Sequence, residues 1–340
     1  MEKTPRKVRF ENMTLQEIAA LANTSVGTVS KAFSGGRDVG SETRERIFAI
    51  ARKNGCFEKY YKGPREKKVI AVLCPETESE HYGRLVGLFE QALSLRDADT
   101  ILAITRFDPA REARLFSELV YRLRIDGMIL IGGGSEIKNP DELPLVILGQ
   151  SKSKYRNNAD YVSNEMPQAI DEAVRTLKEY GHRRVGFIGE ALTESKMKAF
   201  RQSMRRHGLP LYEKYLVTDS ARFAEAGKGG MQTLLDRCSG GELPTAVLAA
   251  YDQIAFGAMR CAQKNGLRVP EDMSFIGMDD ISATDYLGVP LSSIRVRLED
   301  VCEQVIDLLF RRIENRHYRE WQQIVIPARL QLRDSVRKLN

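Results

Sequence analysis

The chain of 340 residues contains few of the side chains that metal and redox sites require. It has four histidines and five cysteines, and neither set shows metal-ligand spacing or a CxxC pair. We therefore expect no metal, no cofactor, and cysteines that are reduced and structural. The sequence also lacks an apolar run of roughly 18 residues and an apolar stretch near its N-terminus. Neither a membrane-spanning helix nor a secretory signal is therefore expected, which favours a cytoplasmic location.

Enzyme motifs are missing as well. The sequence has no GxSxG, no HExxH and no nucleotide-binding loop, and no residue set has the order of nucleophile, base and orienting group. Three glycines, Gly132 to Gly134, follow an expected strand, but the rest of a phosphate-binding motif is absent and a plain turn is favoured. We do not expect an enzyme, although a pocket assembled from distant residues remains an open alternative.

Charge is distributed unevenly along the chain. The net charge is +6, and residues 1–68 alone hold 15 Lys and Arg against 8 Asp and Glu. The remainder holds 37 basic and 38 acidic residues, so it is nearly neutral. A basic excess concentrated at one end of a chain indicates contact with phosphate groups, and nucleic acid is therefore the expected partner.

The basic region contains two short amphipathic patterns separated by a turn. Thr14 and Glu17 have the spacing of a capping box at the start of a first helix. The apolar face expected for that helix consists of Leu15, Ile18, Ala19 and Leu21. Ser25 is placed to cap a second helix over residues 26–33, in which Val29 and Phe33 face inward. This is the layout of a helix-turn-helix, whose second helix enters the DNA major groove.

Several separate motifs resemble one known family. The run TLQEIAALANTSVGTVSKAFSG and the later VGSETRERIFAIARKNG resemble the DNA-binding headpiece of the LacI family of bacterial transcription regulators. GHRRVGFIG (181–189), the run 251–280 and PLSSIRV (290–296) resemble its effector-binding core. The resemblance implies a nucleoid-associated regulator, expected to repress carbohydrate-utilisation genes. It also implies a homodimer on a palindromic operator, because two symmetric headpieces read symmetric DNA.

The sequence divides into an arm, a headpiece, a linker and a core. Residues 1–12 are expected to form a basic arm, and residues 13–56 the headpiece, with a third helix from Ser41 to Asn54. Residues 57–68 are expected to be a linker. It departs from the family's hinge helix, because Gly63-Pro64 interrupts a helix and no leucine occurs between 56 and 68. Tyr60 or Tyr61 is an alternative minor-groove wedge, but a solvated linker is the preferred interpretation.

From Val69 onward, short β-branched runs alternate with amphipathic helical patterns, which predicts an α/β core with parallel sheets covered on both faces. Strands are expected at 69–74, 101–105, 127–132, 145–149, 185–189, 246–250 and 274–278. Helices are expected at 84–95, 110–123, 166–180, 195–207, 225–238 and 253–265. The resemblance implies two doubly wound, periplasmic-binding-protein-like lobes. The first comprises residues 69–163 and 293–326, and the second comprises 164–292 and 327–340.

Candidate DNA contacts lie on the second helix and its flanks. By match to the family pattern, Val26, Gly27 and Lys31 occupy base-reading positions. Lys31 is expected to donate to guanine, an interaction of about 1–3 kcal/mol in base discrimination. The family usually has arginine there, which is a better bidentate reader than lysine. Hydroxyl groups that suit either phosphate contacts or helix capping are those of Thr14, Ser25, Thr28 and Ser30.

Candidate ligand contacts lie at the carboxyl ends of the expected strands, where open α/β sheets bind small molecules. This rule and the family pattern together select His81, Tyr82, Arg106, Gln150, Asn164, Lys196, Arg222, Phe223, Tyr251, Asp252 and Asp279. Pro75-Glu76 and the loop 189–196 also follow strands. Each position has a structural alternative, such as turn capping for Asp279 and packing for Tyr251.

The family's sugar sites usually carry an arginine where this chain has Lys196 and an asparagine where it has Tyr251. If Lys196, Arg106 and Arg222 converge, they suit an anionic ligand such as a uronic acid or a sugar phosphate. Two other interpretations stay open. One is a DNA-binding regulator with a degenerate cleft, gated by a protein partner or not gated, and the other is a solute-binding protein, which the headpiece disfavours.

Overall fold

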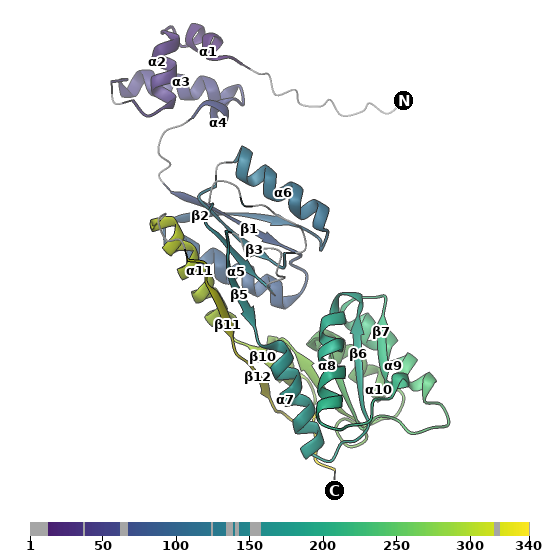
Figure 1. Ribbon diagram of the computed structural model, residues 1–340. Coiled ribbons are helices and arrows are strands. Elements are labelled where there is room, and N and C mark those ends of the chain that lie inside the picture. Colours follow the sequence, from purple (N-terminus) through teal and green to yellow (C-terminus); the bar gives the residue numbers. More distant parts are fainter. Residues whose placement is uncertain are drawn as a thin grey trace, which may run out of the picture. The chain divides into compact units, whose positions relative to one another are not determined.

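The computed structural model describes residues 13–36, 38–61, 67–123, 125–133, 139, 143–149, 158–315 and 320–339. Two compact units make up the chain, Met1–Lys67 and Lys68–Asn340. The first is helical and the second contains all the strands among the described residues (Figure 1). Among the described residues of both units, every helix is too short or too polar to cross a lipid bilayer. The five cysteines are free and buried.

The described residues of the first unit form four helices around one small core: α1 (Leu15–Leu21), α2 (Val26–Phe33), α3 (Ser41–Lys53) and α4 (Phe57–Tyr60). The predicted capping box at Thr14 and Glu17 is present, and Ser25 caps α2 as predicted. Val29 and Phe33 are buried, which confirms the inward face of α2. Leu21 was wrongly placed on the inner face of α1, because it is 59% exposed and Ala22 is buried in its stead.

Helix α4 lies where a solvated linker was predicted. The ring of Phe57 contacts Phe48 at 5.0 Å between centroids and Tyr61 at 4.9 Å. The ring of Tyr60 lies 5.8 Å from Phe33, and its hydroxyl donates to the Met13 carbonyl at 2.8 Å. Residues 57–61 are therefore part of the headpiece core, because these contacts remove the apolar surface of their aromatic rings from water. Residues 62–66, with Gly63-Pro64, lie outside the described residues.

The second unit contains two six-stranded sheets, and each defines one lobe. The strands of the first sheet, all parallel, are in order β11 (Gln323–Ile326), β5 (Asp160–Asn164), β4 (Leu145–Leu148), β3 (Gly127–Ile131), β1 (Lys68–Cys74) and β2 (Ala98–Ile104). Those of the second are β12 (Ala328–Gln331), β10 (Ser292–Val296), β9 (Ser274–Met278), β8 (Ala246–Ala249), β6 (Val185–Glu190) and β7 (Leu216–Asp219). Among the strands of the described residues, only β12 runs antiparallel to its neighbour, β10.

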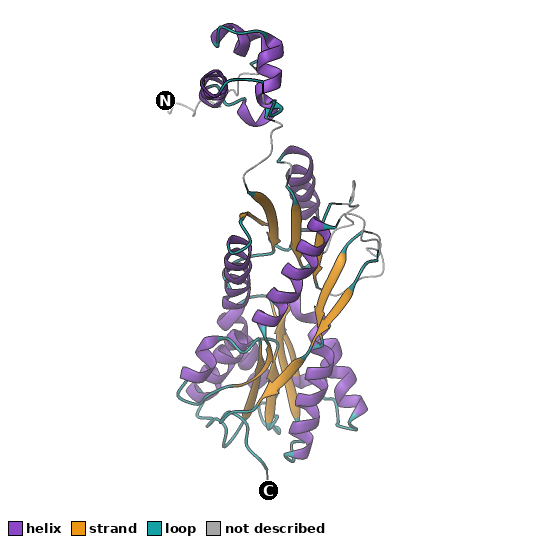
Figure 2. Cartoon of the chain, turned by 90° about the vertical axis from the view of Figure 1, so that its left-hand side faces the viewer, coloured by secondary structure: helices purple, strands orange, loops and turns teal. Residues whose placement is uncertain are grey.

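Helices cover both faces of each sheet (Figures 1 and 2). The first lobe carries α5 (Glu80–Ser94), α6 (Pro109–Arg122) and α11 (Leu298–Glu314). The second carries α7 (Met166–Glu179), α8 (Glu194–Arg206), α9 (Phe223–Arg237) and α10 (Asp252–Lys264). Alternate residues of β1 face opposite layers: Val72 packs with the cluster that includes α5, and Leu73 with the cluster that includes α6. The period of two along a strand thus explains why its sequence is continuously apolar.

The chain passes between the lobes three times. It leaves the first lobe after β5, returns after β10 and leaves again between β11 and β12 at Pro327. The return was expected after about Ser292 and comes later, because Ser293 to Val296 pair with β12 in the second sheet. Strands β5, β7, β10, β11 and β12 and helix α11 were not among the predicted elements.

Candidate functional site

The outer face of α2 presents the residues predicted to contact DNA. Ser25, Val26, Gly27, Ser30 and Lys31 are exposed, with Thr28 half-buried. They form a surface of small, hydroxylated and basic groups beside a buried apolar face. A helix with this division can approach a groove closely, because no large side chain projects before Lys31.

Several of the hydroxyl groups on this surface already serve the helix ends. The Ser25 hydroxyl accepts from the Thr28 amide at 3.0 Å and lies 2.8 Å from the Thr28 hydroxyl. Thr14 donates its hydroxyl to the Glu17 carboxylate at 2.9 Å. The capping interpretation of Thr14 and Ser25 is therefore confirmed, and any phosphate contact would be additional to it.

The predicted base reader, Lys31, has a partner within the headpiece. Its ammonium donates to the Asp38 carboxylate, which follows α2 in the loop toward α3. This hydrogen bond lowers the pKa of Asp38 below its ordinary value. Both side chains are more than half exposed, so the pair is weak and can open when DNA approaches.

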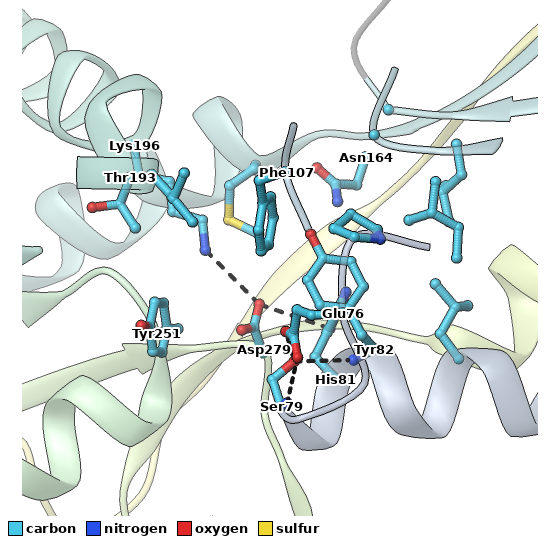
Figure 3. A pocket seen from close by; sticks show the side chains of 18 of the residues that line it. Glu76, Ser79, His81, Tyr82, Phe107, Asn164, Thr193, Lys196, Tyr251 and Asp279 are labelled. Atoms are coloured by element: carbon cyan, nitrogen blue, oxygen red, sulfur yellow. Dashed lines mark hydrogen bonds and ion pairs between the residues drawn. The ribbon is translucent and has the colours of Figure 1, made fainter. Parts of the chain in front are cut away.

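A cavity of about 580 Å³ lies between the two lobes of the second unit. Its walls come from residues directly after strands of both sheets, such as Glu76 after β1, Phe107 after β2 and Asp279 after β9. In Figure 3, Lys196, Thr193 and Tyr251 lie on one side of it and Glu76, Tyr82 and Asn164 on the other, with Asp279 between them. The fold therefore places a ligand-sized cavity where parallel α/β sheets generally bind small molecules.

Nine of the predicted ligand residues line this cavity: His81, Tyr82, Asn164, Lys196, Arg222, Phe223, Tyr251, Asp252 and Asp279. Gln150 lies outside the described residues. Arg106 is exposed and is not among the lining residues, whereas the next residue, Phe107, is. Both have left-handed backbone conformations, with φ of 58° and 57°, in a turn that directs the phenyl ring into the cavity. The strand-end rule found this turn, and of its two side chains the one that lines the cavity is Phe107.

Of the three cations expected to bind an anion, Lys196 and Arg222 line the cavity, and both already have partners in the second lobe. Lys196 donates from its Nζ to the Ala250 carbonyl at 2.7 Å, and Arg222 donates from its Nε to the Glu190 carboxylate at 3.3 Å. Arg106 is outside the cavity. Five carboxyl side chains line the cavity against two cationic ones, and they are Glu76, Glu112, Glu190, Asp252 and Asp279. This excess of carboxyl groups disfavours an anionic ligand, although Glu76, Glu190 and Asp252 already accept hydrogen bonds from Ser79, Arg222 and Ser293.

Asp279 and Asp252 lie in different environments. The Asp279 carboxylate lies 3.9 Å from both the Lys196 Nζ and the His81 Nδ1, beyond direct hydrogen-bond distance (Figure 3). Asp252 is buried, and it accepts from the Ile281 amide at 2.9 Å and the Ser293 hydroxyl at 2.5 Å. Burial raises the pKa of Asp252 well above its ordinary value. Asp252 therefore supports the loop of Asp279, and Asp279 itself has acceptor capacity to offer.

Two tyrosines border the cavity in their neutral form. Burial raises the pKa of both Tyr82 and Tyr251 above their ordinary value. The Tyr251 hydroxyl accepts from the Phe223 amide at 3.0 Å, which fixes its position at the start of α10. Both residues therefore present a ring face to the cavity, which suits the apolar face of a sugar, while the Tyr251 hydroxyl is engaged within the second lobe.

Strained backbone collects around the same cavity. Phe107, Phe223 and Asp279 all line it with positive φ values of 57°, 58° and 97°. Side chains other than glycine rarely adopt this region, and such conformations persist where the surrounding structure holds them and often where function needs them. The two lobes thus hold a carboxylate and two phenyl rings at defined positions in the wall.

Comparison with known proteins agrees with both parts of the structure. Residues 14–55 match the bacterial regulatory proteins of the lacI family, and residues 174–336 match a periplasmic binding protein-like domain. A ribose operon repressor of Haemophilus influenzae is 28% identical, over 96% of this chain and 99% of the relative. Catabolite control protein A of Priestia megaterium is 24% identical, over 96% of this chain and all of the relative.

Solved structures have the same architecture. A transcriptional regulator CelR–cellobiose complex is 25% identical with a TM-score of 0.66, covering 95% of this chain and 100% of that one. The lac repressor dimer bound to operator and an anti-inducer shares the fold, with a TM-score of 0.69 at 19% identity over 96% of this chain and 99% of that one. With its helix-turn-helix and its two-lobed core, this chain belongs to the LacI family of DNA-binding bacterial transcription regulators.

Proposed function

We propose that this regulator is a homodimeric repressor that binds a palindromic operator in the cytoplasm, and that a sugar in the interlobe cavity changes its affinity for DNA. The cavity carries this proposal, because it places the Asp279 carboxylate between the Lys196 Nζ and the His81 Nδ1 where the two lobes meet. The relatives support the ligand class, since one is a ribose operon repressor and another is bound to cellobiose.

On the DNA side, Lys31 is proposed to read guanine and Val26 to contact a thymine methyl, while Gly27 leaves room for the groove edge. The hydroxyls of Ser25, Thr28, Ser30 and Thr14 are proposed to contact phosphates that fix the register. Losing the guanine contact in a Lys31→Ala variant should weaken operator binding about 5- to 150-fold. The loss should concentrate at one base pair of each half-site, because phosphate contacts remain.

On the ligand side, Asp279 is proposed to accept a hydroxyl hydrogen. An oxygen placed between Asp279 and Lys196, or between Asp279 and His81, lies within hydrogen-bond distance of both, because each pair is 3.9 Å apart. A hydroxyl donates to the carboxylate and accepts from the cation, so one group satisfies both. Asn164, Tyr82, Phe223 and Tyr251 add an amide and ring faces, and the carboxyl-rich wall favours a neutral sugar over an acidic one.

The test combines operator selection with a sugar panel. The purified chain is equilibrated with a randomised palindromic DNA pool at several salt concentrations, with and without ribose, cellobiose, glucose and glucuronate. We expect enrichment of one palindrome, and a shift of its affinity by a neutral sugar that is lost in Asp279→Asn. Enrichment that no sugar alters, or a response to glucuronate alone, would contradict the proposed gating, and a mass corresponding to a monomer on DNA would contradict the dimer.

A further inference from the structure

We propose that Arg222 and Phe107 form a clasp that holds the two lobes together across the cavity, and that Arg222 acts as a positioning residue instead of a ligand-binding cation. Arg222 precedes α9 in the second lobe, and Phe107 lies in the turn after β2 in the first lobe. The centre of the guanidinium lies 5.2 Å from the centroid of the Phe107 ring. This is the distance of a cation–π contact.

The second lobe fixes Arg222 from behind. Its Nε donates to Glu190, a carboxylate that is only 3% exposed, and its guanidinium lies 4.4 Å from the centroid of the Phe223 ring. Phe223 is itself held through its amide by the Tyr251 hydroxyl. The planar group therefore has its orientation determined within the second lobe, and only the Phe107 contact reaches across the cavity.

The first lobe fixes Phe107 in a similar way. Its backbone has a φ of 57°, and its ring meets Tyr82 of α5 edge-on at 6.1 Å between centroids. In Figure 3 the rings of Phe107 and Tyr82 lie near each other beside the cavity. The turn that holds Phe107 is tied to β1 by the Arg106 amide, which donates to the Pro75 carbonyl at 2.8 Å. Both halves of the clasp are thus rigid within their own lobes.

Two further contacts join the lobes at the same cavity mouth. The Ser282 amide of the second lobe donates to the Glu80 carboxylate of the first at 2.7 Å, and His81 faces Asp279. If the lobes rotate apart, the internal Glu190–Arg222 contact survives and the Arg222–Phe107 contact is lost. The clasp is therefore a two-state element whose equilibrium a ligand between the lobes can bias.

The clasp predicts which substitutions open the lobes. Phe107→Leu keeps an apolar side chain but removes the ring face, and Arg222→Lys keeps the charge but removes the planar group. Each should raise the ratio of open to closed lobes about two- to five-fold, because the side chain of Arg222 is about one-third exposed and such contacts are modest. Phe107→Trp retains an aromatic ring and should keep the closed population of the parent. If Phe107 only maintained the fold of its turn, Phe107→Trp and Phe107→Leu would not differ in this way.

The test needs no ligand, so it stands apart from the proposed sugar response on which the regulatory meaning of the clasp rests. Spin labels on engineered cysteines at Tyr121 and Tyr212, two exposed positions in opposite lobes, report the interlobe distance. The native cysteines are buried and should label slowly. We expect longer or broader distances in Phe107→Leu and Arg222→Lys and parent-like distances in Phe107→Trp. Unchanged distances in both breaking variants would overturn the clasp.

A second measurement connects the clasp to regulation. Operator affinity of the full chain is measured with and without cellobiose and ribose as probes, in the parent and in the Phe107 variants. A sugar effect on operator affinity that is reduced by about two- to five-fold in Phe107→Leu and retained in Phe107→Trp supports the inference. A sugar effect in Phe107→Leu equal to that of the parent overturns it. If the parent responds to neither sugar, the interlobe distances alone decide, and unchanged distances in Phe107→Leu and Arg222→Lys overturn the clasp.

Discussion

Replacing Phe57 by alanine tests whether residues 57–61 belong to the headpiece. The ring is half-buried and lies 6.0 Å from Phe33, 5.0 Å from Phe48 and 4.9 Å from Tyr61, with the Arg52 guanidinium 4.6 Å from its centroid. A fully buried Phe→Ala change costs about 3–5 kcal/mol. Half of that burial, with the ring contacts, suggests about 2–3 kcal/mol.

This loss is large compared with the stability of so small a unit. At about 0.05–0.15 kcal/mol per residue, a headpiece of about 50 residues has a free energy of unfolding of about 2.5–7.5 kcal/mol. The Phe57→Ala variant should therefore lose a large share of this stability, and at the lower end of the range its headpiece is partly or wholly unfolded at room temperature. Operator binding should fall with the folded fraction, and hydrogen exchange of residues 14–53 should accelerate.

The chain provides its own internal control. Its single tryptophan, Trp321, lies in the second unit and stacks on Arg312 at 3.9 Å, so tryptophan fluorescence follows unfolding of the core alone. That signal should not change in Phe57→Ala. Leu21→Ala, at a side chain that is 59% exposed in α1, should alter headpiece stability by less than about 0.5 kcal/mol. If exchange in Phe57→Ala equals that in Leu21→Ala, residues 57–61 behave as a solvated linker and the assignment fails.

Three further predictions concern the core, each followed by tryptophan fluorescence in denaturant. Arg312→Ala should destabilise by about 3–5 kcal/mol, because it leaves Asp160, 1% exposed, as an unpaired buried charge; a loss below about 1 kcal/mol would refute this. Burial lowers the pKa of His182, so its contribution to stability is complete above the ordinary pKa of about 6.5 and should be lost as pH falls below it, but not in a His182→Gln variant. Gly227→Ala should destabilise by at least about 1–3 kcal/mol, because its Cβ would lie 1.9 Å from a carbonyl of α10, whereas Gly87→Ala meets no atom within 4 Å and should be neutral or stabilising.

The strongest sequence signals proved to be local ones. The capping residues of α1 and α2 were predicted correctly because capping depends on side-chain and amide positions three residues apart. Most core strands and helices were found because their apolar patterns are long and regular. Helix α11 was missed although its apolar spacing is equally regular, and β11 was missed because it is an edge strand with a mixed pattern.

The cavity shows a different limit. Strand ends are readable from sequence, and most of the selected residues line the cavity for that reason. The direction of a side chain could not be predicted from the sequence, because the positive φ values at Arg106 and Phe107 depend on how the turn meets the end of β1. Partners are not readable either: nothing in the sequence connects Arg222 with Glu190, which lies 32 residues earlier. The anionic-ligand hypothesis is disfavoured by these partners and stays a prediction, since the charges were counted before their partners were known.

The segment after α3 departs from the family's hinge pattern, and its two tyrosines pack in the headpiece core. Tyr60 and Tyr61 were considered as wedges for the minor groove, but Tyr61 stacks with Phe57 and meets Phe48 at 5.4 Å, and Tyr60 holds the Met13 carbonyl. A ring inserted between base pairs would have to leave these contacts, each worth about 0.5–1.5 kcal/mol. It would also leave the Met13 carbonyl without its partner. Insertion therefore competes directly with the folding of the headpiece. The same aromatic residues that could have extended the DNA-binding surface instead stabilise the headpiece, so we expect recognition to depend on the face of α2.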